Sequence, residues 1–297
     1  MIVKLANYLL LIPVLLISLL PLRILYLLSD FTAWLLRKIF RYRYDVALIN
    51  ISRSFPHMKY HQVQSVLKDF YRNFTDVFFE MIWSLRISRK REYQRFQMEN
   101  TDLFRRIYDR GSSVIIVTAH KANWEVLKPF NFPSTGFSEK DAVVIYKKLA
   151  NKVFDRMLKW IRGKGSNATL VESGDTVRFM INNCNKQHLY FLVADQNPSP
   201  GSQIHINFLN QPTLFINGPE KLSRKLNIPV VYMDVTRIER GKYRGTFEMV
   251  EENPSLSDVN KISMKFAELL EKSIRRDPSQ WLWTHKRWKY TFKEQSN

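Results

Sequence analysis

Cysteine is nearly absent from this 297-residue chain, which has one, at position 184. A single cysteine excludes an internal disulfide and a cysteine-rich metal site. Glycine is also scarce, at nine residues, while hydrophobic residues make up 45% of the chain. This composition excludes fibrous and disordered proteins, and the length suits one large α/β domain or two modest ones.

Two common catalytic signatures are missing as well. There is no Gly-x-Ser-x-Gly elbow, the turn that carries the serine nucleophile of α/β hydrolases. The six histidines show no metal-ligand spacing, since His57 and His61 lie four apart in a polar region without acidic partners. We therefore expect neither a serine nucleophile nor a bound metal.

Acidic residues are outnumbered, with 27 against 46 lysines and arginines, which gives a formal net charge of +19. Such a charge predicts acidic partners: nucleic acid, anionic lipid or an acidic protein. Nucleic acid is disfavoured because the basic residues are dispersed and no helix-turn-helix, zinc-finger or RNA-recognition signature is present. An anionic membrane or an acidic protein is the expected partner.

The first forty residues contain an apolar stretch, Leu5–Leu22, that carries no charge and is interrupted by Pro13 and Pro21. Eighteen residues are near the lower limit for crossing the hydrocarbon core. A cleaved signal peptide is disfavoured because no small-x-small pattern follows. A single transmembrane helix and a monotopic helical hairpin both fit, so we expect a membrane anchor over residues 1–40 and a single domain over residues 41–297.

Basic residues flank this anchor unequally, with one lysine before it and four basic residues at positions 37–43 after it. The positive-inside rule then places the bulk of the protein on the cytoplasmic side of the membrane. The same cations can contact anionic headgroups.

Beyond the anchor, residues 45–96 are predicted to be helical, because apolar residues recur at spacings of three and four between Val63 and Val77. Strands and helices then alternate. Strands are predicted at residues 114–119, 142–146, 168–171, 188–194 and 229–236, with a hairpin turn at 240–242 leading into residues 245–250. This alternation predicts an α/β fold with a mostly parallel central sheet and helices on both faces. The hairpin suggests an antiparallel edge.

The sharpest signal lies where the first of these strands ends, at His120. Asn123 is a good helix cap, so a helix is expected to begin there with Glu125 in its first turn. Positions five apart on one continuous helix lie roughly 140° apart, so His120 and Glu125 can meet only across a strand-to-helix turn. In that turn the glutamate can accept a hydrogen bond from one ring nitrogen and leave the other free to take a proton.

Further polar residues stand at the ends of other predicted strands: Lys147, the pair Asp195-Gln196, and Arg237. The carboxyl ends of parallel strands meet at one edge of the sheet, where α/β proteins keep their sites. Any one of these residues could be polar simply because strand ends reach solvent. Together with His120, however, they predict a site at this edge.

At this point the sequence resembles a known family. The segment His120–Glu125 is similar to the His-x4-Glu/Asp block of membrane acyltransferases that act on glycerolipids and lipid A. Within these, the chain resembles the bacterial lipid A biosynthesis (late) acyltransferases, the lauroyl/myristoyl acyltransferase family of the lysophospholipid acyltransferase-like superfamily. The resemblance covers most of the chain, and its other segments are Asn50–Pro56, Tyr146-Lys147, Ala194–Gln196, Asn227–Val231, Arg237 and Trp283–Lys289.

The resemblance implies a glycerolipid acyltransferase-like fold and an O-acyltransferase that moves a fatty acyl chain from acyl-acyl carrier protein to a hydroxyl of a lipid A precursor. It implies that His120 is the general base and that Glu125 orients its imidazole. The implied substrate-binding residues are Asn123, Lys147, Asp195, Gln196 and Arg237.

The same resemblance sets expectations for the partners. They are an acidic acyl carrier protein, a phosphorylated lipid acceptor and an anionic membrane surface, without nucleic acid. No cofactor is implied, since the acyl thioester is a co-substrate. The implied location is the bacterial inner membrane, with the catalytic domain facing the cytoplasm.

The sequence departs from the family pattern at three positions: Ala122 and Asn210 stand where glycine is frequent, and Lys147 replaces arginine. Lysine keeps the charge but loses the bidentate fork for phosphate. Two alternatives therefore stay open: the same mechanism on another acceptor, such as an aminolipid, a phosphoglycolipid or a lysophospholipid, and a non-catalytic, basic, membrane-tethered binding protein.

Overall fold

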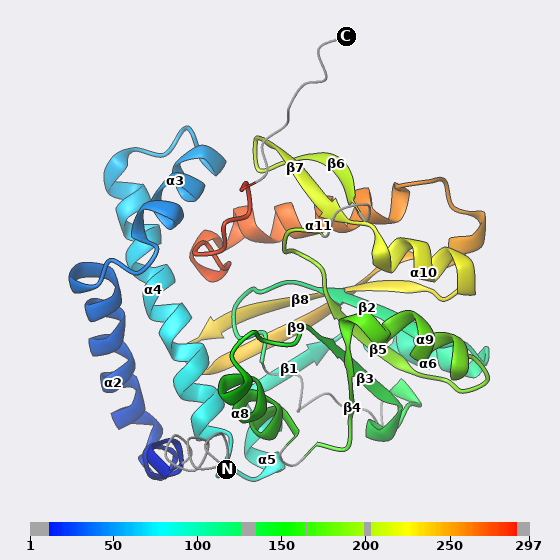
Figure 1. The fold of residues 1–297 in the computed structure, drawn as a ribbon, viewed down its shortest axis with the longest axis horizontal. Helices are drawn as coiled ribbons and strands as arrows, with labels where there is room; N and C mark the ends of the chain where they lie inside the picture. Colours follow the sequence, from blue (N-terminus) through cyan, green and yellow to red (C-terminus); the bar gives the residue numbers. More distant parts are fainter. Residues whose placement is uncertain (1–11, 126–134, 164–165, 199–202, 290–297) are drawn as a thin grey trace.

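The computed structural model describes residues 12–125, 135–163, 166–198 and 203–289. Its centre is a seven-stranded sheet in the order β1-β9-β8-β2-β5-β3-β4 (Figure 1). The strands are β1 (Phe96–Glu99), β2 (Val114–Thr118), β3 (Ala142–Tyr146), β4 (Thr169–Glu172), β5 (Leu189–Val193), β8 (Val230–Glu239) and β9 (Lys242–Glu251). Among the neighbouring pairs of this sheet, β8 and β9 are antiparallel and the others are parallel. The predicted α/β class with a mostly parallel sheet is confirmed.

Helices cover both faces of the sheet. They are α2 (Leu22–Trp34), α3 (Tyr44–Ser54), α4 (Tyr60–Trp83), α5 (Arg89–Tyr93), α6 (Asp102–Asp109), α8 (Lys152–Gly163), α9 (Thr176–Asn182), α10 (Gly218–Leu226) and α11 (Lys261–Arg276). Successive side chains of a strand point to opposite faces, and β2 shows this directly. Ile115 and Val117 pack in one apolar cluster with α4 and α11, whereas Val114 and Ile116 pack in another with α6.

Two details of the sheet differ from the prediction. Strand β1 pairs in parallel with β9, so β9 lies inside the sheet and β1 forms the edge. The chain after β5 also forms a separate hairpin of β6 (Gln203–Phe208) and β7 (Gln211–Ile216). Its turn places Leu209 and Asn210 at positive φ, which asparagine tolerates better than most residues.

The described part of the N-terminal region is helical over residues 12–18, breaks at 19–21 and resumes as α2 after Pro21. Proline lacks an N–H and disfavours helical geometry at the preceding residue, which accounts for the break. Helix α2 lies alongside α4 (Figure 1). Over the residues that the structure describes, no helix has both the length and the apolar character needed to cross a membrane. Residues 1–11 of the predicted anchor lie outside the described residues.

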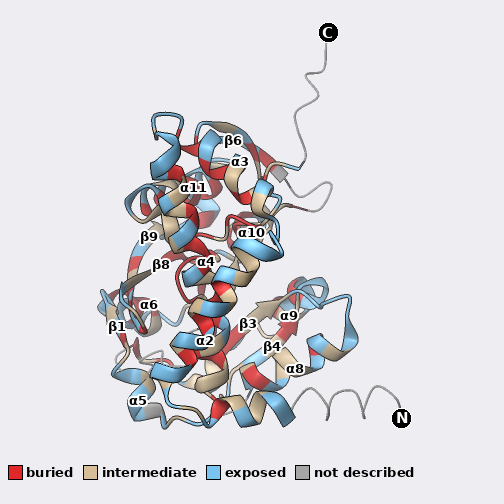
Figure 2. Ribbon diagram, turned by 90° about the vertical axis from the view of Figure 1, so that its left-hand side faces the viewer, coloured by how far each residue is buried: buried red, intermediate tan, exposed pale blue. Residues whose placement is uncertain are grey.

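Helices α2 and α4 differ in how much of each is buried (Figure 2). Helix α2 buries Leu25, Ser29 and Ala33 against its neighbours and leaves most of its other residues exposed or half-buried. Helix α4 buries nine of its residues. The outer side of α2 is therefore apolar without being covered by the described part of the chain.

Candidate active site

The register of the sheet brings His120 and Asp195 together. Thr118, the last residue of β2, pairs with Val193, the last residue of β5. His120 and Asp195 each stand two residues beyond these strand ends, so they emerge side by side. Nδ1 of His120 lies 2.7 Å from Oδ1 of Asp195, and the backbone N–H of His120 donates to Oδ2 at 3.0 Å.

Asp195 is buried and ionised at this position. Burial by itself raises the pKa of a carboxyl group, but His120 and the hydrogen bond from Trp281 outweigh burial and hold the pKa of Asp195 below its ordinary value. The indole Nε1–H of Trp281 donates to Oδ2 at 2.8 Å. A carboxylate on Nδ1 fixes the tautomer in which Nε2 of His120 carries the lone pair that can accept a proton.

The expected pairing of His120 with Glu125 is replaced by a different one. Both carboxylate oxygens of Glu125 accept hydrogen bonds from Arg162 of α8, at 2.9 and 2.7 Å. The reason lies in residues 121–125, which form turns in place of the first helical turn. Ala122 adopts a left-handed φ of 52°, and the loop directs Glu125 toward α8. The predicted continuation of that helix, residues 126–128, lies outside the described residues.

The C-terminal segment holds this loop in place. Lys121 forms an isolated β-bridge with Trp281, and the N–H of Ala122 donates to the carbonyl of Gln280 at 2.7 Å. The N–H of Leu282 in turn donates to the carbonyl of His120 at 3.1 Å. The backbone on both sides of the histidine is therefore fixed by residues about 160 positions later in the chain.

A cavity of about 820 Å³ lies beside His120. His120, Trp124, Glu125 and Arg162 contribute to its wall, so the ion pair of the last two lines the cavity. Apolar side chains from strands β3 and β5 and helices α8 and α10 line much of the remainder, among them Val144, Phe191, Leu158 and Leu222. A cavity of this size and character suits an apolar ligand.

Of the other predicted site residues, Lys147 and Gln196 also line this cavity. Lys147 is exposed at the end of β3, as the strand pattern predicted. The amide nitrogen of Gln196 lies 3.2 Å from Nε2 of His120. Asp195 belongs to the same cluster, but it contacts the histidine and is too buried to be a substrate-binding residue.

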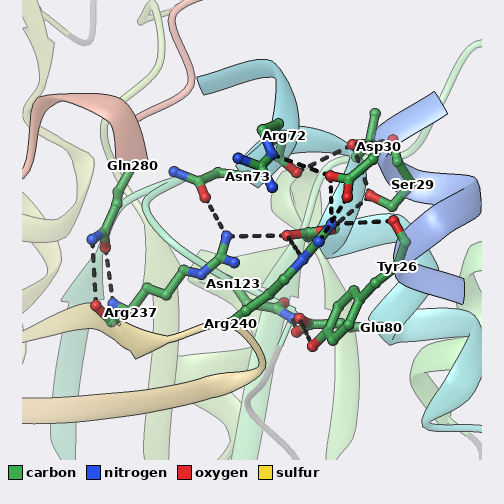
Figure 3. Close-up of polar contacts among 12 residues, drawn as sticks. Tyr26, Ser29, Asp30, Arg72, Asn73, Glu80, Asn123, Arg237, Arg240 and Gln280 are labelled. Carbon is green, nitrogen blue, oxygen red and sulfur yellow. Dashed lines mark hydrogen bonds and ion pairs between the residues drawn. The ribbon is translucent and has the colours of Figure 1, made fainter. Parts of the chain in front are cut away.

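Asn123 and Arg237 are not among the residues that line the cavity. Asn123 is buried, and its amide donates to Glu80 at 2.9 Å. Arg237 is held by Asn73 and by Asp76, whose Oδ2 lies 3.1 Å away (Figure 3). Because these partners already bind its guanidinium, the predicted role of Arg237 in binding phosphate is not supported by its position.

Two residues of the site were missed by sequence reasoning. Arg162 directly follows Ile161 on α8, and the apolar pattern of a helix does not tell which charged residue turns toward a site. Trp281 was not predicted as a site residue, because it lies about 160 positions from His120 in the chain. Trp281 and Trp283 are buried beside the loop of residues 121–125, with their rings 4.7 Å apart.

A histidine–aspartate pair beside a large, mainly apolar cavity, at the strand ends of a parallel sheet, is an arrangement that suits general-base chemistry on an apolar substrate. The family model for bacterial lipid A biosynthesis acyltransferase matches residues 1–290. The chain belongs to this family and is an acyltransferase, as the sequence motifs indicated.

Two curated relatives illustrate the similarity. The chain is 23% identical over 261 residues to the lipid A biosynthesis palmitoleoyltransferase of Escherichia coli (strain K12). The aligned region covers 85% of this chain and 81% of that protein. It is similar to the same extent, 23% over 261 residues, to the lipid A biosynthesis acyltransferase of Shigella flexneri.

Proposed function

We propose that this protein is a membrane-bound O-acyltransferase that moves a fatty acyl chain from acyl-acyl carrier protein to a hydroxyl of a lipid A precursor. The observation that carries the proposal is the His120–Asp195 pair, with its Nδ1–Oδ1 distance of 2.7 Å, beside a cavity of about 820 Å³. The family membership supplies the reaction class.

In the proposed reaction, Nε2 of His120 removes the proton from the acceptor hydroxyl as its oxygen attacks the thioester carbonyl. The tetrahedral intermediate collapses, the C–S bond breaks, and the imidazolium returns the proton to the leaving thiolate. The products are an ester and a free thiol, and no metal or cofactor takes part. Asp195 stabilises the imidazolium and holds its tautomer.

In this proposal Glu125 forms part of the cavity wall. Its carboxylate is neutralised by Arg162, so in the described arrangement it shapes the site electrostatically without contacting His120. The motif alone would suggest that Glu125 orients the imidazole of His120. In the proposal Asp195 has this role, because it is the carboxylate that contacts Nδ1. Variants at the two carboxylates separate these roles.

The proposed partners follow from charge. Lys147 stands at the cavity and can bind a phosphate of the acceptor or of the donor's phosphopantetheine arm. The net charge of +19 favours docking of an acidic carrier protein by electrostatic steering. The single lysine, where a bidentate arginine is usual, keeps another phosphorylated lipid acceptor as the alternative substrate.

The proposed location is the cytoplasmic face of the bacterial inner membrane. Exposed apolar residues are concentrated in the N-terminal region, and they include Leu16, Leu19, Leu27, Phe31, Trp34 and Phe40. Arg23, Arg37 and Lys38 lie among them in the chain. Apolar side chains flanked by cations suit an anionic bilayer surface.

The experiment that tests the function is mass spectrometry of lipid A from the native host, with and without a His120→Ala replacement. Loss of the mass of one acyl chain from lipid A is the expected result. Unchanged lipid A together with loss of an acyl chain from another lipid would keep the mechanism and change the acceptor. No change in any lipid, with the variant stably expressed, would overturn the acyltransferase mechanism and favour a binding protein.

A further inference from the structure

Glu80 is a buried carboxylate of α4 at which three separate parts of the chain meet (Figure 3). Tyr26 of α2 donates to its Oε1 at 2.8 Å. Tyr243 of β9 donates to Oε2 at 2.8 Å. Asn123, in the loop of residues 120–125 (the His120 loop), donates to the same oxygen at 2.9 Å. One side chain thus joins the N-terminal helix, the sheet and the candidate active site.

The contact with Asn123 determines how the loop is held. Asn123 is 2% exposed, and while its amide nitrogen donates to Glu80, its oxygen accepts from the backbone N–H of Glu125 at 3.2 Å. An asparagine amide can satisfy both contacts in one orientation, because Glu80 offers an acceptor and the Glu125 N–H is a donor. Loss of the acceptor at position 80 would leave a buried amide without its partner and free to turn.

Burying a carboxylate is costly, and burial raises the pKa of Glu80, against the effect of Arg95 and of the donors from Tyr243, Tyr26 and Asn123. Asp76, one helical turn earlier on the same face of α4, is also buried but has a different role. Its carboxylate is bound by Ser29, Arg237 and Arg240 and contacts no residue of the His120 loop among the bonds described. These two acids therefore link the same helices and differ in whether they reach the loop.

We propose that Glu80 is a positioning residue for catalysis: it fixes the orientation of Asn123, and so the loop of residues 120–125, and ties that loop to α2 through Tyr26. The proposal rests on the proposed function for its effect on turnover. The geometry of the loop is independent of the substrate, and it can be measured separately.

The test compares Glu80→Ala and Glu80→Gln with Asp76→Ala as the matched control, all in the full-length protein. Thermal unfolding gives the stability of each variant, hydrogen exchange followed by mass spectrometry gives the protection of residues 119–125, and acyl transfer from acyl carrier protein to a lipid A precursor gives kcat and KM. Should Asp76→Ala fail to fold, Tyr243→Phe is the second control, because it removes a bond to Glu80 outside the loop.

We expect Glu80→Ala to lose protection at residues 119–125 and to lower kcat by about 10- to 100-fold, the range that a small misplacement of catalytic groups produces. Glu80→Gln keeps an acceptor oxygen for Asn123 and should stay within about threefold of wild type. The control should lose stability but keep both the protection of the loop and kcat. KM should change little in all of them.

Equal protection of residues 119–125 in Glu80→Ala and the control would overturn the proposal, as would a Glu80→Gln variant as impaired as Glu80→Ala. If the loop loosens in Glu80→Ala alone while wild-type protein transfers no acyl chain, the positioning role stands and the proposed function fails.

Discussion

His120 is the proposed general base, and the carboxylate that it contacts is that of Asp195. The sequence identified the histidine correctly as a residue at a strand end, but it suggested the wrong neighbour. Asp195 lies 75 positions away, and only the register of β2 with β5 brings the two together. Spacing along the chain suggests local partners such as Glu125, whereas register between distant strands is set by packing of the whole sheet.

A pair of isosteric variants tests which carboxylate serves the histidine. Asp195→Asn should lower kcat by about 10²- to 10⁴-fold, because an amide can stabilise the wrong tautomer and cannot balance the imidazolium charge. Glu125→Gln should cost about tenfold or less, since Arg162 is its partner. Steady-state kinetics on both, with thermal unfolding as the control for folding, decides the matter. The reverse ranking would mean that Glu125 takes over the orienting role during turnover.

His285 leads to a prediction about pH. Burial lowers its pKa to about 4, opposed by Asp195 and assisted by Arg287, His120 and Arg43. The neutral ring accepts the backbone N–H of Asn197 through Nε2 at 3.4 Å. Because the unfolded chain takes up a proton near pH 6.5 and the folded chain only near pH 4, stability is full above about pH 6.5 and falls as the pH drops toward 4.

The corresponding measurement is the melting temperature between pH 7.5 and pH 4.5 for wild type and His285→Gln. Glutamine keeps an acceptor for Asn197 but does not titrate in this range. The wild-type melting temperature should therefore fall by a few degrees more than that of the variant. Parallel curves would show that other groups control acid stability.

Among the elements, the turn of the β8–β9 hairpin shows how tightly α2 packs against the rest of the described chain. Gly241 in its turn has a φ of 79°, and a Cβ there would collide with the side chains of Arg95 and Tyr26. Gly111 has a similar φ of 75° with open space around it. Gly241→Ala should therefore cost about 2–4 kcal/mol, from backbone strain and overpacking together, and Gly111→Ala only about 1 kcal/mol. Denaturant unfolding of the two variants gives the comparison, and equal costs would contradict the close packing of α2 on the hairpin.

Among the strands and helices, the sequence predicted best those with a long run or a long periodic pattern of apolar residues. The central strands were predicted to within a few residues, and the spacing of apolar residues between Val63 and Val77 predicted the middle of α4, because apolar runs and helical spacing are strong signals. The four-residue β1 and the β6–β7 hairpin, which contains Pro212, gave no comparable signal. A helix was predicted to begin at Asn123 because asparagine suits a cap, whereas residues 121–125 form turns and Lys121 is bridged to Trp281.

For the whole molecule, the distribution of exposed apolar residues predicts which part of its surface binds a membrane. Leu27 and Phe31 of α2 are 65% and 58% exposed. A Leu27→Glu/Phe31→Glu double variant should bind anionic vesicles about tenfold more weakly or worse, because two apolar side chains would no longer enter the bilayer surface. Vesicle flotation measures this effect.

The control for that experiment is Leu256→Glu. Leu256 is 85% exposed but lies outside the N-terminal region, just before α11. Its replacement should leave vesicle binding unchanged. If it weakened binding as much as the α2 variant, the membrane would be meeting the protein through a different face.

The bridge between Lys121 and Trp281 has a consequence for how the enzyme is made. The His120 loop is completed by residues 280–282, which leave the ribosome after every strand of the sheet has been synthesised. A chain that stops prematurely after α11 would contain His120, Asp195 and the whole central sheet, yet it would lack the segment that braces both of them. Residues 280–282 follow every strand of the sheet in the chain and complete the surroundings of His120, so a chain truncated after α11 should lose the bonds that hold His120 and Asp195 and, with them, the proposed acyl transfer.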